Sequence, residues 1–227
     1  MNQNAMQIAL ILDRSGSMSS IQEATVEGLN AFLSEQRQST AKVSLLLAQF
    51  DDEYEQLYSG PLAEAPSFTL SDQPSPRQVR FLPRGWTALL DAMGKTIDDL
   101  GQTLAALPED QRPGKVVVVT MTDGAENKSK TYTWQQLAEI IGLQRNAYKW
   151  EFQFLAANQD AIATAAAINI PMGNAITYAA SAQGARNVIA AASRNVREYA
   201  MPCAAMPSYR TSDRAAALEQ EPEKAKP

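Results

Sequence analysis

Oxygen-bearing side chains gather at points in the sequence where apolar runs end. Asp13, Ser15 and Ser17 follow the first apolar run of the chain, and Asp123 follows a run that contains four consecutive valines. Thr87 adds a hydroxyl at the start of a helical pattern. Two carboxylates and three hydroxyls, with no nitrogen or sulfur, suit a hard divalent cation. Uncharged hydroxyls with few carboxylates favour Mg²⁺, although Mn²⁺ and Ca²⁺ also accept oxygen ligands.

A scaffold must bring these distant residues to one place. Apolar runs predict strands over residues 6–12, 43–50, 115–122, 150–156 and 175–178. Apolar residues at helical spacing predict helices over 17–37, 87–107, 133–147, 160–168 and 181–199, with Thr133, Asp160 and Ser181 at their first positions. Residues 54–58 are expected to return antiparallel to the second strand. Proline-rich residues 59–85 are expected to be a loop, with at most a short edge strand.

Strands that alternate with helices predict an α/β fold with an open, mostly parallel sheet and helices on both faces. Ligands of such sheets bind at the carboxyl ends of the strands, where the oxygen-bearing residues fall. The 227 residues are expected to form one domain over residues 1–200. Residues 201–227, with four prolines and an alanine-rich patch, are expected to form a flexible tail that buries little.

Composition excludes several classes of protein. The chain has a formal charge of -5, so it lacks the excess of basic residues that nucleic-acid binders show. The absence of histidine excludes Ser-His-Asp catalysis and imidazole zinc sites, and a single cysteine, Cys203, excludes an intramolecular disulfide. No apolar run approaches the roughly 20 residues that span a bilayer. The first apolar run is not preceded by the positively charged residues of a secretory signal peptide. A cytoplasmic protein without membrane contact is therefore expected.

The oxygen-bearing residues also carry a family resemblance. Asp13-x-Ser15-x-Ser17, Thr87 and Asp123-Gly124 resemble the metal-ion-dependent adhesion site of von Willebrand factor A (vWA) domains. Segments 50–54, 87–92 and 154–160 are similar to stand-alone bacterial and phage-carried members of that superfamily, and the resemblance covers about residues 5–200. It implies a Rossmann-like, doubly wound, mostly parallel sheet with one antiparallel edge strand.

The resemblance further implies a non-enzymatic function. Members of the family bind proteins, often through an acidic side chain that completes the coordination of the metal. By position, Ser15 and Ser17 would coordinate directly, whereas Asp13, Thr87 and Asp123 would coordinate directly or through water. The expected cofactor is Mg²⁺, and the expected partner is a protein that presents an Asp or Glu.

Further residues near the strand ends are candidates for a rim that contacts the partner. Asp51 and Asp52 end the second strand. They form a solvated hairpin tip, support the metal ligands from outside the coordination sphere, or make an acidic edge that selects the partner. Trp86 is either an exposed anchor for a partner or a residue packed inward, and Arg84 beside it contacts the partner or stays solvated. Asn158 follows the predicted strand 150–156 and completes the rim.

Two other functions remain open at this stage. The chain could be a structural or assembly protein, phage-encoded for example, in which the five residues are only helix caps and a turn and the metal site is vestigial. A metal-dependent hydrolase is less favoured, because neither a Gly-x-Ser-x-Gly elbow nor a phosphate-binding loop is present. With both carboxylates on the metal, the set also holds no obvious general base.

Overall fold

The fold centres on one six-stranded sheet. The computed structural model describes residues 1–157 and 160–219. The strand order is β3-β2-β1-β6-β7-β8, and every neighbouring pair is parallel except β2 and β3, which are antiparallel. The strands are β1 (Asn2–Asp13), β2 (Lys42–Phe50), β3 (Tyr54–Pro61), β6 (Pro113–Thr122), β7 (Glu151–Ala157) and β8 (Ala175–Tyr178). The predicted mostly parallel sheet with one antiparallel edge strand is confirmed.

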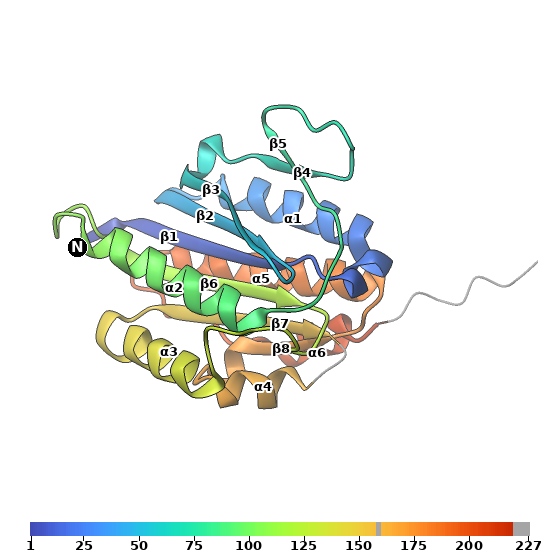
Figure 1. Ribbon diagram of the computed structural model, residues 1–227. Coiled ribbons are helices and arrows are strands. Elements are labelled where there is room, and N and C mark those ends of the chain that lie inside the picture. Colours follow the sequence, from blue (N-terminus) through green and yellow to red (C-terminus); the bar gives the residue numbers. More distant parts are fainter. Residues whose placement is uncertain (158–159, 220–227) are drawn as a thin grey trace, which may run out of the picture.

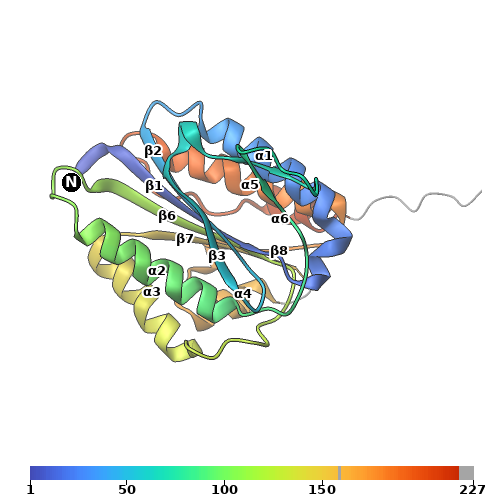
Figure 2. The ribbon, with the colours of Figure 1, turned by 45° about the horizontal axis from the view of Figure 1, so that its top comes forward.

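Helices cover both faces of this sheet (Figures 1 and 2). One face carries α1 (Gln22–Gln36), α5 (Ala182–Ala200) and α6 (Thr211–Ala217). The other face carries α2 (Leu89–Ala105), α3 (Trp134–Tyr148) and α4 (Ala161–Ala167). The predicted doubly wound α/β arrangement is therefore observed.

The alternation of side chains along β1 explains why this strand lies at the centre. Ile8, Leu10 and Leu12 point into the hydrophobic core under α1 and α5, whereas Ala9 and Ile11 point into the core under α2 and α3. A strand buried on both faces needs apolar residues at every position, and residues 8–12 are all apolar. The run ends at Asp13, which therefore emerges at the carboxyl edge of the sheet.

The predicted first residues of three helices act as caps. The Thr133 hydroxyl accepts a hydrogen bond from the Gln136 amide, and the Asp160 carboxylate accepts two at the start of α4. Ser181 caps α5 in the same way. Each cap satisfies amide groups that have no partner within the helix.

Residues 59–85 contain more regular structure than their prolines predict. β3 extends to Pro61, and a short helical turn (Leu62–Glu64) follows it. β4 (Ser67–Thr69) and β5 (Gln78–Arg80) then pair in parallel as a separate two-stranded sheet. Short strands of this kind need few ladder hydrogen bonds, so nearby prolines do not prevent them.

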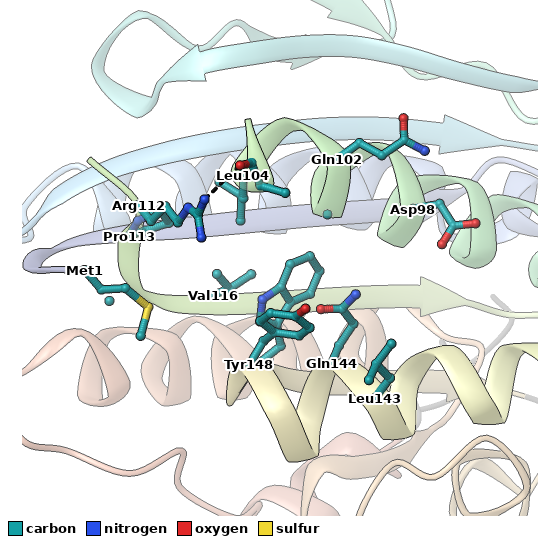
Figure 3. A pocket seen from close by; sticks show the side chains of 14 residues that line it. Met1, Asp98, Gln102, Leu104, Arg112, Pro113, Val116, Leu143, Gln144 and Tyr148 are labelled. Carbon is teal, nitrogen blue, oxygen red and sulfur yellow. Dashed lines mark hydrogen bonds between the residues drawn. The ribbon is translucent and has the colours of Figure 1, made fainter. Parts of the chain in front are cut away.

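A cavity of about 380 Å³ opens between α2 and α3 at the amino ends of β6 and β7 (Figure 3). Gln102 and Leu104 of α2 face Leu143 and Tyr148 of α3 across it. None of the residues that line it belongs to the predicted metal site. The cavity lies at the amino ends of the strands, so it is remote from the carboxyl-end residues.

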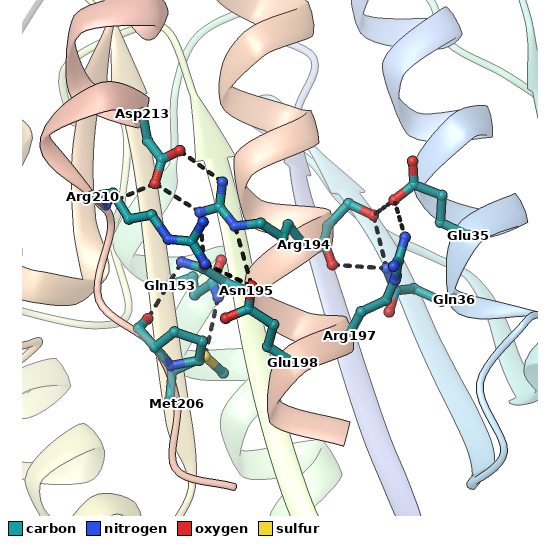
Figure 4. Close-up of polar contacts among 12 residues, drawn as sticks. Glu35, Gln36, Gln153, Arg194, Asn195, Arg197, Glu198, Met206, Arg210 and Asp213 are labelled. Atoms are coloured by element: carbon teal, nitrogen blue, oxygen red, sulfur yellow. Dashed lines mark hydrogen bonds and ion pairs between the residues drawn. The ribbon is translucent and has the colours of Figure 1, made fainter. Parts of the chain in front are cut away.

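Residues 201–219 do not form a free tail, which corrects the prediction for this part of the C-terminal segment. Tyr209 is buried, and its hydroxyl donates to Gln153 Oε1 on β7 at 2.6 Å. Arg194 of α5 holds both carboxylate oxygens of Asp213 at 2.7 Å (Figure 4). Prolines and alanines form no periodic pattern in the sequence. The buried Tyr209 and the ion pair between Arg194 and Asp213 are nevertheless enough to dock a short helix.

No helix within residues 1–157 and 160–219 is both long and apolar enough to cross a lipid bilayer.

Candidate metal centre

The loop after β1 carries three of the predicted ligands. Asp13 is fully buried, and its Oδ1 accepts a hydrogen bond from the Ser15 amide at 2.6 Å. Ser15 is buried, whereas Ser17 is exposed, and their hydroxyl oxygens lie 3.1 Å apart. The chain turns here into a short helix (Gly16–Ile21), so Ser15 and Ser17 lie on the same side of the turn.

The end of β6 supplies the second carboxylate. β6 lies beside β1 in parallel, so the carboxyl ends of the two strands are neighbours (Figure 1). Asp123 Oδ1 accepts a hydrogen bond of 2.6 Å from the Ser17 hydroxyl. The Thr122 hydroxyl donates to Asp13 Oδ2 at 2.5 Å, which joins the ends of the two strands. The sheet thus brings together residues more than 100 positions apart in the sequence.

Thr87 reaches the same place from the segment before α2. Gly85 has a positive φ of 67°, a conformation that favours glycine, and a Cβ atom there would also lie within 3.3 Å of the Asp51 Cβ. The Asn127 side chain accepts a hydrogen bond from the Thr87 amide at 3.0 Å, and the Asn127 amide donates to the Thr87 carbonyl. Thr87 is therefore fixed against the loop that follows Asp123.

Gly124 shows how closely the hydroxyl groups converge. A Cβ atom placed on Gly124 would lie 3.1 Å from Thr87 Oγ1, 3.6 Å from Ser17 Oγ and 4.0 Å from Ser15 Oγ. Three hydroxyl oxygens from two separate loops thus surround one small space beside Asp123. An arrangement of this kind fits a small cation with oxygen ligands better than it fits helix capping, which needs no convergence.

Burial controls the charge of both carboxyl groups. Loss of solvent raises the pKa of Asp13 to about 6, against the hydrogen bonds from Thr122 and Ser15 that lower it. Burial also raises the pKa of Asp123, although the Ser17 hydroxyl hydrogen bond opposes this shift. Desolvated carboxylates favour either a proton or a cation close by. Both groups are therefore poised to take up positive charge at this edge of the sheet.

The ligand chemistry is that of hydroxyls and few carboxylates. Within residues 1–157 and 160–219, no group of three or more His, Cys, Asp or Glu side chains lies where it could hold a metal ion. A site here depends on Ser15, Ser17 and Thr87 as well as on the two carboxylates. Such a set offers only oxygen ligands, which suit a hard divalent cation.

Three of the predicted rim residues are accessible beside this centre. The Trp86 side chain is 60% exposed, and Lys128 Nζ lies over its ring at 5.6 Å from the centroid. Asp52 is exposed, and its Oδ1 accepts a hydrogen bond of 3.1 Å from the Trp86 amide. Arg84 is half exposed and pairs with Glu53, so it is not merely solvated.

Asp51 does not belong to the rim, which corrects its placement there. Its side chain is 1% exposed and accepts hydrogen bonds from the guanidinium groups of Arg14 and Arg84. A buried carboxylate between two arginines cannot contact a partner. Asn158, the remaining predicted rim residue, lies outside the residues that the structure describes.

Sequence reasoning did not find Thr122 or Arg14 as parts of the centre's support, and it placed Asn127 only close enough to Asp123 to shape the rim. Thr122 contacts Asp13, Asn127 fixes Thr87, and Arg14 binds Asp51 from within the Asp-x-Ser-x-Ser loop. Thr122 and Arg14 directly flank predicted ligands in the sequence, which is the one signal that could have pointed to them. Their partners lie far away in the chain, so only the folded structure shows what they do.

Comparison with known proteins is informative at the level of structure. No protein-family model matches the sequence, and no curated protein matches it significantly. Among solved structures, proximal thread matrix protein 1 from the mussel byssus, described with a zinc-occupied metal-ion-dependent adhesion site (MIDAS) motif, superposes with a TM-score of 0.56 at 13% identity, covering 87% of this chain and 47% of that one. A von Willebrand factor type A protein from Catenulispora acidiphila superposes with a TM-score of 0.54 at 12% identity, covering 87% and 43%.

The chain has the von Willebrand factor A fold. The D319A variant of the PilB minor pilin from Streptococcus sanguinis is also similar, with a TM-score of 0.54, 9% identity, and coverage of 87% of this chain and 62% of that one. The chain spans about half the length of the first solved structures that it matches. Identities this low establish the vWA fold and leave the function to be inferred from the site.

Proposed function

We propose that this vWA protein is a non-enzymatic binding module that holds a divalent cation at the carboxyl edge of its sheet and recognises an acidic side chain of a protein partner. The observation that carries the proposal is the convergence of the Ser15, Ser17 and Thr87 hydroxyls around Gly124, beside Asp123. Two further observations support the proposal. The sequence pattern resembles the adhesion site, and the structurally similar mussel protein is described with a MIDAS motif.

Asp13, Ser15, Ser17, Thr87 and Asp123 are the residues that would hold the cation, with Mg²⁺ the expected ion and Mn²⁺ a close substitute. When bound, the cation supplies an electrophilic point to which a carboxylate of the partner attaches. Asp13 and Asp123 together balance the charge of a dication, so an incoming carboxylate is not repelled by surplus acid. Ser17 is exposed, so the partner has access from the solvent side.

The exposed Trp86 would supply apolar contact beside the attachment point, since aromatic residues at the edge of a polar site dominate many interfaces. Arg84 and Asp52 would set the polar surroundings of the partner's acidic residue. The module has no enzymatic role in this proposal, because both carboxylates are committed to the cation and neither is left to act as a general base.

Calorimetric titration of the full chain with Mg²⁺ and with Mn²⁺ tests the metal site. We expect saturable binding in the wild type, and its loss in Asp13→Ala and Asp123→Asn. Asp110→Ala, an exposed acidic residue on the loop between α2 and β6, is the matched control and should bind as the wild type does. The proposal would be refuted if the wild type shows no saturable binding, or if the two site variants bind the metal as tightly as the wild type does.

Affinity purification then tests the role of the cation in recognition. A partner that attaches through the cation should be retained by the wild type in Mg²⁺ and lost both in EDTA and with Asp13→Ala. A partner retained equally under all three conditions would show that recognition does not pass through the metal site.

A further inference from the structure

Asp51 joins the segments that carry the predicted ligands. It follows β2, whose last residue Phe50 pairs with Asp13 in the parallel register of the sheet. Asp51 Oδ2 accepts hydrogen bonds from Arg14 Nε at 3.0 Å and from Arg84 Nε at 2.7 Å. Its Oδ1 accepts from the Glu53 amide at 2.6 Å, so both carboxylate oxygens are used.

Each arginine belongs to a loop that carries ligands. Arg14 lies between Asp13 and Ser15, and Arg84 lies three residues before Thr87. The main chain of Asp51 adds a third link, because its carbonyl accepts from the Ala88 amide at 2.9 Å, next to Thr87. One buried residue thus holds the Asp-x-Ser-x-Ser loop and the Thr87 segment at the same time.

We infer that Asp51 is a positioning residue of the metal centre, which sets the distance between the Ser15–Ser17 loop and the Thr87 segment without touching the cation. The inference rests on the proposed function. Partners that orient metal ligands typically change metal affinity by about 10- to 100-fold when they are removed. A buried carboxylate that binds two guanidinium groups is a stiff link of this kind, since charge-assisted hydrogen bonds are short and directional.

The link is not the only one between the two segments. The Arg84 amide donates to the Arg14 carbonyl at 2.7 Å, and the Gly16 amide donates to the Gly85 carbonyl at 3.3 Å. Loss of the Asp51 charge should therefore loosen the ligand set and not take it apart. We expect Asp51→Asn to weaken the affinity for Mn²⁺ by about 10- to 100-fold and not to abolish binding.

A change in net charge near a cation site could mimic this effect, and two variants separate the two causes. Glu53→Gln removes an equal negative charge from a carboxylate that also binds Arg84 but lies at the surface. Positioning by Asp51 predicts that Glu53→Gln stays within about twofold of the wild type, because exposed ion pairs contribute little. Arg84→Met removes a positive charge, so a pure field effect would tighten Mn²⁺ binding, whereas loss of positioning weakens it.

The experiment is a calorimetric Mn²⁺ titration of the full chain as wild type, Asp51→Asn, Glu53→Gln, Arg84→Met and Asp13→Ala, at a temperature well below each unfolding transition. Weaker binding by Asp51→Asn and by Arg84→Met, with Glu53→Gln unchanged, supports the inference. Wild-type affinity in Asp51→Asn, or tighter binding by Arg84→Met, overturns it.

Three further outcomes are also decisive. If Asp51→Asn does not fold, Arg84→Met decides alone, because Arg84 is half exposed and Asp51 keeps its hydrogen bond from Arg14 in this variant, so we expect it to fold. If the wild type binds no Mn²⁺, or Asp13→Ala binds as the wild type does, the proposed metal site itself fails and the positioning role with it. If Asp13→Ala loses binding and Asp51→Asn keeps it, only the positioning role is refuted.

Discussion

At the scale of single residues, the centre depends on a glycine, Gly124, because a residue without a side chain leaves room for the ligands. Gly124 leaves space that the Ser15, Ser17 and Thr87 hydroxyls share, and a methyl group there would lie 3.1 Å from Thr87 Oγ1. Its φ is not in the left-handed region, so alanine meets no backbone strain at this position. Substitution therefore changes the site and little else.

Gly124→Ala is expected to lower Mg²⁺ affinity by about 10-fold or more, because the new methyl group occupies the space between the ligands. The unfolding free energy of the metal-free protein should fall by only about 1 kcal/mol, the low end for an added methyl group. Calorimetry and urea unfolding in EDTA measure the two quantities.

Gly101→Ala is the matched control. Its new Cβ would lie 3.5 Å from Gln144 Nε2, beside the cavity at the amino ends of the strands and remote from the centre, so metal affinity should not change. It should gain about 0.5–1 kcal/mol of stability from helix propensity. Equal metal affinity in Gly124→Ala and the wild type would show that the space beside Asp123 is not the site of the cation.

At the scale of elements, the parallel strands place the two carboxylates and help to anchor the C-terminal segment. β1 and β6 end at the same edge of the sheet, which brings Asp13 and Asp123 together. β7 and the helix α5 contact the C-terminal segment. α6 is fixed by Arg194 of α5, which binds Asp213, and by the Arg210 amide, which donates to the same carboxylate at 2.7 Å. The hydrogen bonds from Arg194 lower the pKa of Asp213 below its usual value.

Asp213→Asn is expected to cost about 1.5–3 kcal/mol of unfolding free energy at pH 7, as for hydrogen bonds to charged groups. Because the pKa of Asp213 is lowered on folding, this stabilisation is present above about pH 4 and is lost as the pH falls through the lowered value. Urea unfolding at pH 7 and pH 3 should show the difference between wild type and variant shrinking with acid. A pH-independent difference would mean that the charge of Asp213 does not hold α6.

At the scale of the whole molecule, cation binding and folding are linked. The ligands come from the loop after β1, the segment before α2 and the end of β6, so only the folded chain assembles them. A ligand that binds only the folded state raises stability by mass action. Metal should therefore stabilise the entire fold and not one loop alone.

Mg²⁺ at about 100 times its dissociation constant should add about 2.7 kcal/mol of stability. For a chain of this size, that corresponds to a rise in Tm of about 5–10 °C. Differential scanning calorimetry of the wild type and of Asp123→Asn, each in EDTA and in Mg²⁺, measures it. A similar rise in the Asp123→Asn variant would show that the ion stabilises the protein from somewhere else.

The sequence by itself determined the scaffold and the position of the ligands along it. Apolar runs and helical spacing are local patterns, so they predicted the parallel strands, the caps at Thr133 and Asp160, and the location of Asp13 and Asp123 at strand ends. The five-residue ligand set stays a prediction, although its members do lie together in the structure.

Only the tertiary structure decided which polar residues are buried and what they bind. The sequence leaves Asp51 open as a solvated hairpin tip, a supporting residue of the metal site or part of an acidic edge, and only the structure shows that two arginines, 37 and 33 positions away, enclose it. The segment around Tyr209 reads as a free tail, yet it docks on Gln153, which lies 56 positions earlier. Burial of a charge or of a short helix depends on partners that folding supplies from distant parts of the chain, and no local pattern records them.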